Sequence, residues 1–139
     1  MRRSRNTELV LAALRAEPGR ALTAYDLLGR LAGEGLRGPP TVYRALDALL
    51  RGGQIHRIES LNAFAACSHG GDVGHDHHRH THRPAFAVCR DCGAVQELED
   101  PALAAVLGVV AERTGYRVEE RVIELVGACG ACAARPQAG

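Results

Sequence analysis

The fold is decided by the stretch PPTVYRALDALLRGG, which covers residues 39–53. A proline in the first turn of a helix is tolerated because its missing N–H would be unpaired there, and the paired glycines at its end stop the helix. Apolar residues recur at helical spacing and form one stripe, which comprises Val42, Leu46, Leu49 and Leu50. The opposite side carries Thr41, Tyr43, Arg44, Asp47 and Arg51. The stretch therefore predicts an amphipathic helix with one buried and one exposed face.

Two shorter helices are expected before this stretch, and a hairpin after it. The first helix ends at Glu17-Pro18-Gly19, and the second begins after Thr23 as its N-cap. The runs Gln54–Glu59 and Ala63–Cys67 flank a short polar turn and predict a β-hairpin. Two helices joined by a glycine-containing turn and followed by a hairpin form a winged helix-turn-helix.

A winged helix-turn-helix predicts binding to double-stranded DNA, with the helix over 39–51 in the major groove. Arg44 would reach a guanine edge or a phosphate, and Thr41 and Tyr43 would contact the backbone. Residues 1–60 carry 10 arginines and 6 acidic residues, whereas residues 61–139 carry 7 and 10. This division favours a polyanion partner for the first half. Two alternatives remain: the arginines of this helix form a solvated face, and the uneven charge of the two halves has no functional consequence.

The composition limits which classes of protein the chain can belong to. The 139 residues are 46% hydrophobic, which permits a core, and with 4% aromatic residues and no Trp that core must be aliphatic. No apolar run approaches the ~18 residues that a membrane span needs, and no signal-type apolar stretch follows the basic N-terminus. We therefore expect a cytoplasmic protein, in which thiols stay reduced and paired cysteines favour metal over disulfide.

Three segments are expected along the chain: a winged-helix DNA-binding domain over 1–67, a His-rich hinge loop over 68–84, and a second domain over 85–139. The loop holds six of the seven histidines and has no apolar periodicity. The fold class is thus α+β, with an N-terminal winged helix-turn-helix domain.

The last segment predicts strands over 85–89 and 94–98, a helix that begins at Asp100-Pro101, and a long strand over Tyr116–Val126. The helix is apolar on both sides, and a domain of about 55 residues is too small to bury both of these sides itself. We therefore expect a homodimer.

Two CxxC pairs carry the strongest chemical signal. The spacing lets both thiolates of one pair point at a single ion, and two pairs complete a tetrahedral zinc site. We expect a structural zinc on four ligands, Cys89, Cys92, Cys129 and Cys132. The alternative explanations of these cysteines are a redox-active pair and buried free thiols. Both are disfavoured because the chain has two pairs and does not begin with a thioredoxin-like βαβ unit.

These motifs resemble the ferric uptake regulator family, and within it the zinc uptake regulators. The resemblance rests on both CxxC motifs, on the stretch 39–46 and on the preceding Ala24-Tyr25-Asp26-Leu27-Leu28, and it covers residues 4 to 133. It implies a homodimer that binds palindromic operators when metal is bound. It also implies that residues 85–139 form a C-terminal α/β dimerisation domain, which the four-cysteine zinc site staples. It also makes Tyr25, with Arg44, a candidate for base or groove contact, and Thr41 and Tyr43 candidates for phosphate contact.

The resemblance further implies a regulatory zinc site. Its four ligands match His56 in the wing, Cys67 at the end of the wing, His82 before the first CxxC, and Glu97 after it. Zinc accepts such a mixed set, and its ligands come from both sides of the hinge, so occupancy would fix the angle between domains. Taken singly, His56 is also explained as a wing residue, Cys67 as a buried thiol and Glu97 as a solvated strand residue.

Two features depart from the family. An N-terminal helix of many members is expected to be missing here or replaced by an arm with Arg2, Arg3 and Arg5. The hinge loop is unusually rich in histidine, so it would hold a third metal or bind metal only adventitiously. The candidates for that third site are His75, His77, His78 and His80. His80 has the same chemistry as His82 and competes with it as the regulatory ligand.

The function that these features favour is a zinc-responsive transcriptional repressor of metal-uptake genes with two zinc ions per subunit. An iron or peroxide sensor of the same family would use a site without thiolate, so Cys67 favours zinc. A His-rich zinc storage or delivery protein is a further alternative. An enzyme is disfavoured because the four-cysteine site leaves no position for water and the mixed site fills every position with protein. We expect no small-molecule substrate and no membrane partner.

Overall fold

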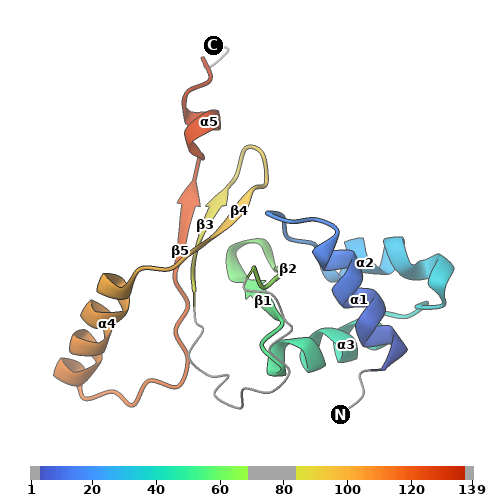
Figure 1. The fold of residues 1–139 in the computed structure, drawn as a ribbon, viewed down its shortest axis with the longest axis horizontal. Helices are drawn as coiled ribbons and strands as arrows, with labels where there is room; N and C mark the ends of the chain where they lie inside the picture. Colours follow the sequence, from blue (N-terminus) through green and yellow to red (C-terminus); the bar gives the residue numbers. More distant parts are fainter. Residues whose placement is uncertain (1–3, 69–83, 137–139) are drawn as a thin grey trace.

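The computed structural model describes residues 4–68 and 84–136. Its N-terminal part holds three helices, α1 (Arg5–Arg15), α2 (Ala24–Leu31) and α3 (Pro39–Arg51), with a short 3-10 turn, η1 (Ala32–Glu34), after α2 (Figure 1). Thr23 caps α2 as predicted, and it does so within a capping box that it forms with Asp26.

The three helices and the wing enclose one aliphatic core. Its members are buried and come from all three helices, from both wing strands and from the connecting segments, among them Val10, Leu14, Leu27, Leu36, Val42, Leu46, Leu49 and Ile55. The predicted stripe of α3 supplies three of these side chains. The polar side of α3 therefore faces outward, as an amphipathic helix requires.

The wing is an antiparallel hairpin of β1 (Ile55–Ile58) and β2 (Ala63–Ala66), joined by the 3-10 turn η2 (Glu59–Leu61). Asn62 closes the turn in the left-handed region at φ 47°, which Asn tolerates better than most residues. Leu22 and Phe64 exchange two backbone hydrogen bonds of 2.8 Å, so the segment before α2 lies beside the wing. The helices and this hairpin confirm the winged helix-turn-helix.

The second part is a three-stranded sheet with two helices. Strand β3 (Ala85–Cys89) is central, β4 (Val95–Leu98) pairs with it antiparallel, and β5 (Glu124–Gly127) pairs with it parallel. Helix α4 (Pro101–Thr114) crosses from β4 towards β5, and Asp100 caps it as predicted. A short helix, α5 (Gly130–Ala133), follows β5, and the sequence did not predict it.

The long strand predicted over Tyr116–Val126 is wrong. Only Glu124–Gly127 forms a strand, and residues 116–123 are in neither helix nor strand. The β-branched residues of this stretch favour extended backbone, but a strand also needs a ladder partner. The central strand β3 is only five residues long, and its pairing with β5 begins at Glu124.

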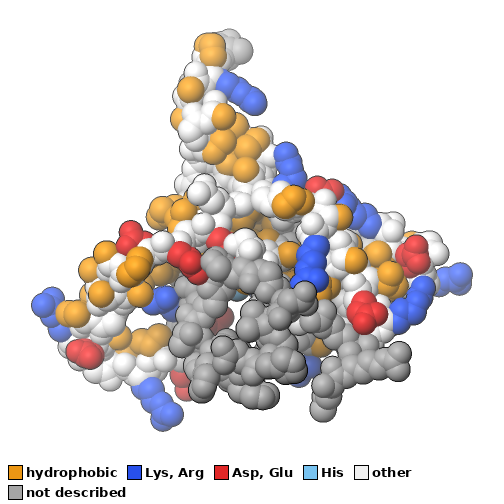
Figure 2. Space-filling model, in the orientation of Figure 1, with side chains coloured by type: hydrophobic (Ala, Val, Ile, Leu, Met, Phe, Trp, Pro, Cys, Tyr) orange, Lys and Arg blue, Asp and Glu red, His pale blue; other side chains and the backbone are white. Residues whose placement is uncertain are grey.

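Helix α4 has no buried residue within the chain. Its valines Val106, Val109 and Val110 are 59%, 45% and 47% exposed, and hydrophobic side chains lie on the surface over α4, at the left of Figure 2. The expected cover for its apolar sides is therefore not supplied by residues 4–68 and 84–136. None of the helices in the described residues is long and apolar enough to cross a membrane.

A second apolar cluster spans the boundary between the two parts. Ile58 and Ala65 of the wing pack with Phe86 and Val88 of β3 and with Val95 of β4, and all five are buried. Burial of apolar surface stabilises this contact without any metal ligand. The wing therefore rests directly on the second sheet.

Candidate metal centres

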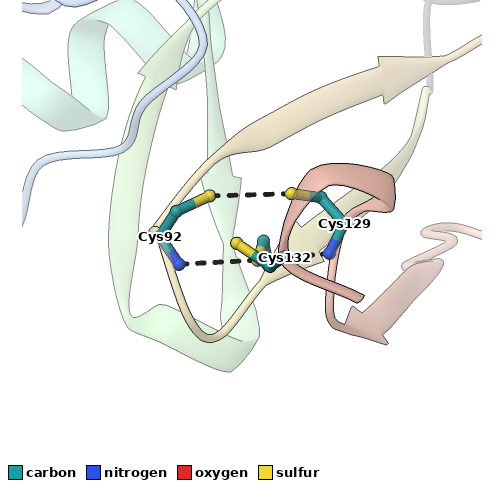
Figure 3. Close-up of side chains that lie close together, drawn as sticks. Cys92, Cys129 and Cys132 are labelled. Atoms are coloured by element: carbon teal, nitrogen blue, oxygen red, sulfur yellow. Dashed lines mark hydrogen bonds between the residues drawn. The ribbon is translucent and has the colours of Figure 1, made fainter. Parts of the chain in front are cut away.

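The two CxxC pairs meet at one end of the second sheet. Cys89 and Cys92 lie at the turn between β3 and β4, and Cys129 and Cys132 lie at the start of α5 and within it. One sulfur from each cysteine lies within 4.8 Å of all the others, and Sγ of Cys92 and Cys129 are 3.8 Å apart (Figure 3). The pairing of β5 with β3 brings the second pair to the first, although 37 residues separate Cys92 from Cys129.

The surroundings of these sulfurs favour a thiolate at Cys89 and oppose one at Cys132. The N–H groups of Cys92 and Cys129 donate to Sγ of Cys89 at 3.5 and 3.2 Å, and they lower the pKa of Cys89 to about 6. Hydrogen bonding with the Cys129 thiol, together with burial, raises the pKa of Cys132 to about 12. Crowded thiols resist joint ionisation, whereas thiolates beside a dication do not. Four sulfurs at this spacing therefore fit a closed tetrahedral zinc site.

A second cluster joins the wing to the sheet. His56 comes from β1, Cys67 follows β2, and Glu97 lies on β4; one donor atom of each lies within 4.8 Å of the other two. Nε2 of His56 is 3.5 Å from Oε1 of Glu97, and these side chains are 13% and 10% exposed. The His56 ring also packs against Phe86, with ring centroids 5.5 Å apart.

Three of the four residues that the resemblance implied as regulatory ligands are thus brought together. His82 lies outside the described residues, as do His75, His77, His78 and His80, the candidates for a third site. A nitrogen, a sulfur and an oxygen donor with little exposure form a set that zinc accepts. A fourth ligand would complete tetrahedral coordination.

Ser68 is a part of this cluster that the sequence did not reveal. Its N–H donates to Oε1 of Glu97 at 3.0 Å, and its hydroxyl donates to Oε2 at 2.7 Å. Hydrogen bonds of this kind orient a carboxylate ligand and are part of a metal site. The available signal was weak, since Ser68 is only the neighbour of Cys67 in a polar stretch.

The predicted DNA-contacting residues lie on the first part of the chain. Tyr25 near the start of α2 is 79% exposed, and Tyr43 on α3 is 46% exposed. Arg44 is exposed on α3, and Thr41 in its first turn is half-buried. All four are therefore on or near the surface of the two helices that a helix-turn-helix presents to DNA.

Comparison with known proteins gives consistent matches. A model of the ferric uptake regulator family matches residues 1–126. The chain is 39% identical over 113 residues to the zinc uptake regulation protein of Escherichia coli (strain K12), a match that covers 81% of this chain and 62% of that relative. It is 32% identical over 117 residues to the ferric uptake regulation protein of Neisseria gonorrhoeae, covering 82% and 74%.

Two solved structures are similar throughout. A zinc uptake regulator complexed with zinc and DNA has a TM-score of 0.82 at 35% identity and covers 96% of this chain and 84% of its own. The structure of holo XcZur has a TM-score of 0.81 at 35% identity, with coverage of 97% and 89%. With a family match over most of its length and these relatives, the chain belongs to the ferric uptake regulator family.

Proposed function

We propose that this protein is a zinc-responsive transcriptional repressor that binds palindromic operators of metal-uptake genes as a homodimer. The observation that carries the proposal is the meeting of His56, Cys67 and Glu97 at the contact between the wing and the second sheet. A thiolate in this set favours zinc over iron. The relatives with 39% and 35% identity are zinc uptake regulators, which supports the same choice.

Two zinc sites per subunit follow from the donor sets. The structural site uses Cys89, Cys92, Cys129 and Cys132, whose four sulfurs leave no position for water. The regulatory site uses His56, Cys67 and Glu97, with His82 as the fourth ligand. Its mixed donors hold zinc less tightly than four thiolates, which suits a site that must fill and empty with supply.

The regulatory site joins two parts of the chain that also meet through apolar contacts and backbone hydrogen bonds. His56 and Cys67 belong to the wing, whereas Glu97 belongs to β4. Zinc bound there would tie the wing to the sheet. Zinc would therefore increase the population of the arrangement in which these three side chains meet. The size of the increase is set by how much more tightly this arrangement binds zinc than the others do.

The DNA-binding face is the outward side of α3. Arg44 contacts a guanine edge or a phosphate, and Thr41, Tyr43 and Tyr25 contact the backbone or the groove around it. A dimer engages a palindrome when its two recognition helices are about one helical turn of DNA apart. The exposed valines of α4 supply an apolar surface for the partner subunit.

A mobility-shift titration against candidate operator DNA tests this proposal. Zinc, iron and manganese are compared at controlled free concentrations with protein whose cysteine site is already loaded. We expect zinc to promote operator binding at a lower free concentration than iron or manganese. An equal response to iron, or binding that ignores metal, would contradict the proposal.

The alternative of a zinc storage or delivery protein rests on the histidines of the hinge segment. Deletion of residues 70–80 removes four histidines but leaves His82 and the cysteine pairs. A repressor keeps its zinc-dependent operator affinity after this deletion. A carrier instead loses metal capacity, which equilibrium dialysis would measure.

A further inference from the structure

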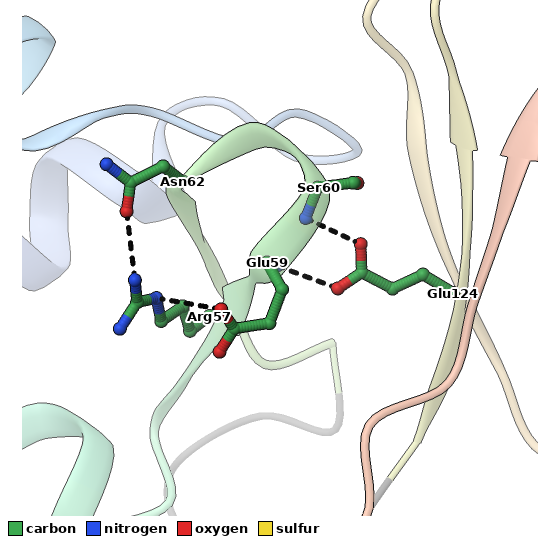
Figure 4. A network of polar contacts seen from close by, with 5 residues as sticks. All are labelled: Arg57, Glu59, Ser60, Asn62 and Glu124. Carbon is green, nitrogen blue, oxygen red and sulfur yellow. Dashed lines mark hydrogen bonds and ion pairs between the residues drawn. The ribbon is translucent and has the colours of Figure 1, made fainter.

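The carboxylate of Glu124 contacts the turn of the wing. Oε2 accepts a hydrogen bond from the N–H of Glu59 at 2.7 Å, and Oε1 accepts one from the N–H of Ser60 at 2.9 Å (Figure 4). These two N–H groups open the turn η2, where the first N–H groups have no acceptor within the turn itself. One side chain of the second sheet therefore binds two consecutive backbone groups of the wing.

Glu124 is held firmly on its own side of this contact. It is the first residue of β5, and its backbone is paired with Phe86 in the central strand. The N–H of Phe86 donates to the carbonyl of Ile123 at 3.0 Å, and the N–H of Arg90 donates to that of Gly127 at 2.8 Å. Because β5 leads directly into Cys129, its position is also tied to the cysteine cluster.

The contact favours the ionised form of the Glu124 carboxyl group. Burial raises the pKa of the carboxyl, but hydrogen bonding to Ser60 and to the N–H of Glu59 outweighs burial and leaves the pKa below its ordinary value. Hydrogen bonds to an ionised acceptor are about twice as strong as neutral ones. The contact is thus a charge-assisted pair of hydrogen bonds.

The turn that Glu124 holds lies between the two wing ligands of the regulatory cluster. His56 lies on β1, three residues before Glu59, and Cys67 follows the return strand β2. The register of the hairpin is fixed, with His56 opposite Ala65. Any rotation of the wing about its apolar contact with β3 would therefore move His56 and Cys67 relative to Glu97, and Glu124 opposes that rotation from a separate point.

We propose that Glu124 is a positioning residue for metal sensing, which holds the wing so that His56 and Cys67 face Glu97. The proposal rests on the proposed regulatory role of that cluster. A site that is arranged before its ligand arrives does not spend binding free energy on ordering its parts. Loss of the contact should therefore weaken regulatory zinc binding while the cysteine site stays loaded.

The test compares the full-length variants Glu124→Gln and Glu124→Ala with the control Glu120→Gln, whose side chain is exposed four residues earlier. Amide hydrogen exchange at residues 59 and 60 reports the contact itself. Competition with a chelator reports regulatory zinc affinity, and zinc content reports the cysteine site. Gln keeps the size of Glu, so it carries the test if the Ala variant fails to fold.

Glu124→Gln has one neutral acceptor oxygen in place of two charged ones, so we expect it to lose protection at one or both amides, whereas Glu124→Ala should lose it at both. Both variants should bind regulatory zinc about tenfold more weakly. Structural zinc and operator affinity at saturating zinc should stay near wild type, as should every readout of Glu120→Gln. Zinc affinity within twofold of wild type, after the amides have lost protection, would overturn the proposal. If wild-type protein shows no zinc-dependent operator binding, the repressor function fails, whereas exchange and zinc affinity still decide the role of Glu124.

Discussion

The guanidinium of Arg20 donates a hydrogen bond to the carbonyl of Cys92 at 3.0 Å. This contact joins the segment before α2 to the turn that carries the first cysteine pair. The N–H of Val95 also donates to the carbonyl of Gly19 at 2.8 Å. The cysteine site is therefore docked against the helical part of the chain, at a different place from the contact made by Glu124.

Replacement of Arg20 by alanine should loosen this docking. An exposed hydrogen bond of this kind contributes about 1 kcal/mol, so we expect the melting temperature of the zinc-loaded protein to fall by about 2–5 °C. Removal of zinc from the cysteine site by a chelator should also be faster. Arg15→Ala, an exposed change at the end of α1, is the control. Equal melting and equal zinc release in both variants would argue against a docking role.

Replacement of Cys67 by serine should abolish most of the zinc response. A serine hydroxyl is a much poorer zinc ligand than a thiolate, so zinc-dependent operator binding is expected to weaken by more than about tenfold. The four other cysteines are unchanged, and each subunit should therefore retain one tightly held zinc. Metal analysis after dialysis and a mobility shift at fixed free zinc measure the two effects. An unchanged response would remove Cys67 from the regulatory site.

The parts of the structure that the sequence predicted correctly are those with local signals. Thr23 caps α2, the prolines begin α3 and Gly52 ends it, as predicted from neighbours within a few residues. The cysteine cluster was also predictable, since each CxxC pair presents two ligands by its own spacing. The meeting of His56 and Cys67 with Glu97 came from the family resemblance, because no periodicity links them.

The parts that the sequence did not predict depend on distant partners. Glu124 contacts Glu59 across 65 residues, and Arg20 contacts Cys92 across 72. Neither contact leaves a local pattern, because a surface carboxylate or guanidinium is usually solvated. The error over residues 116–123 has the same origin. Their composition favours extended backbone, but no strand in the described part of the chain pairs with them.

Ser68 should tune the regulatory site without being a ligand. It donates two hydrogen bonds to Glu97, and loss of a group that orients a metal ligand costs about 10- to 100-fold in affinity. Ser68→Ala keeps the N–H bond and loses the hydroxyl bond of 2.7 Å, so we expect the lower end of that range. Ser68→Thr should restore most of the affinity. Chelator competition measures both variants, and wild-type affinity in Ser68→Ala would show that the hydroxyl does not position the carboxylate.

Replacement of Arg44 by alanine separates the two kinds of DNA contact that an exposed arginine on α3 can make. If Arg44 binds a guanine edge, operator affinity should fall by about 1–3 kcal/mol and discrimination at one base position should relax. If it binds a phosphate, affinity should fall for all sequences and the salt dependence should lose about one unit of slope. Zinc affinity should not change in either case, because Arg44 lies on α3 and is not a member of the regulatory cluster. Operator binding measured across salt concentrations and base substitutions gives both quantities, and wild-type values in each would exclude Arg44 from the interface.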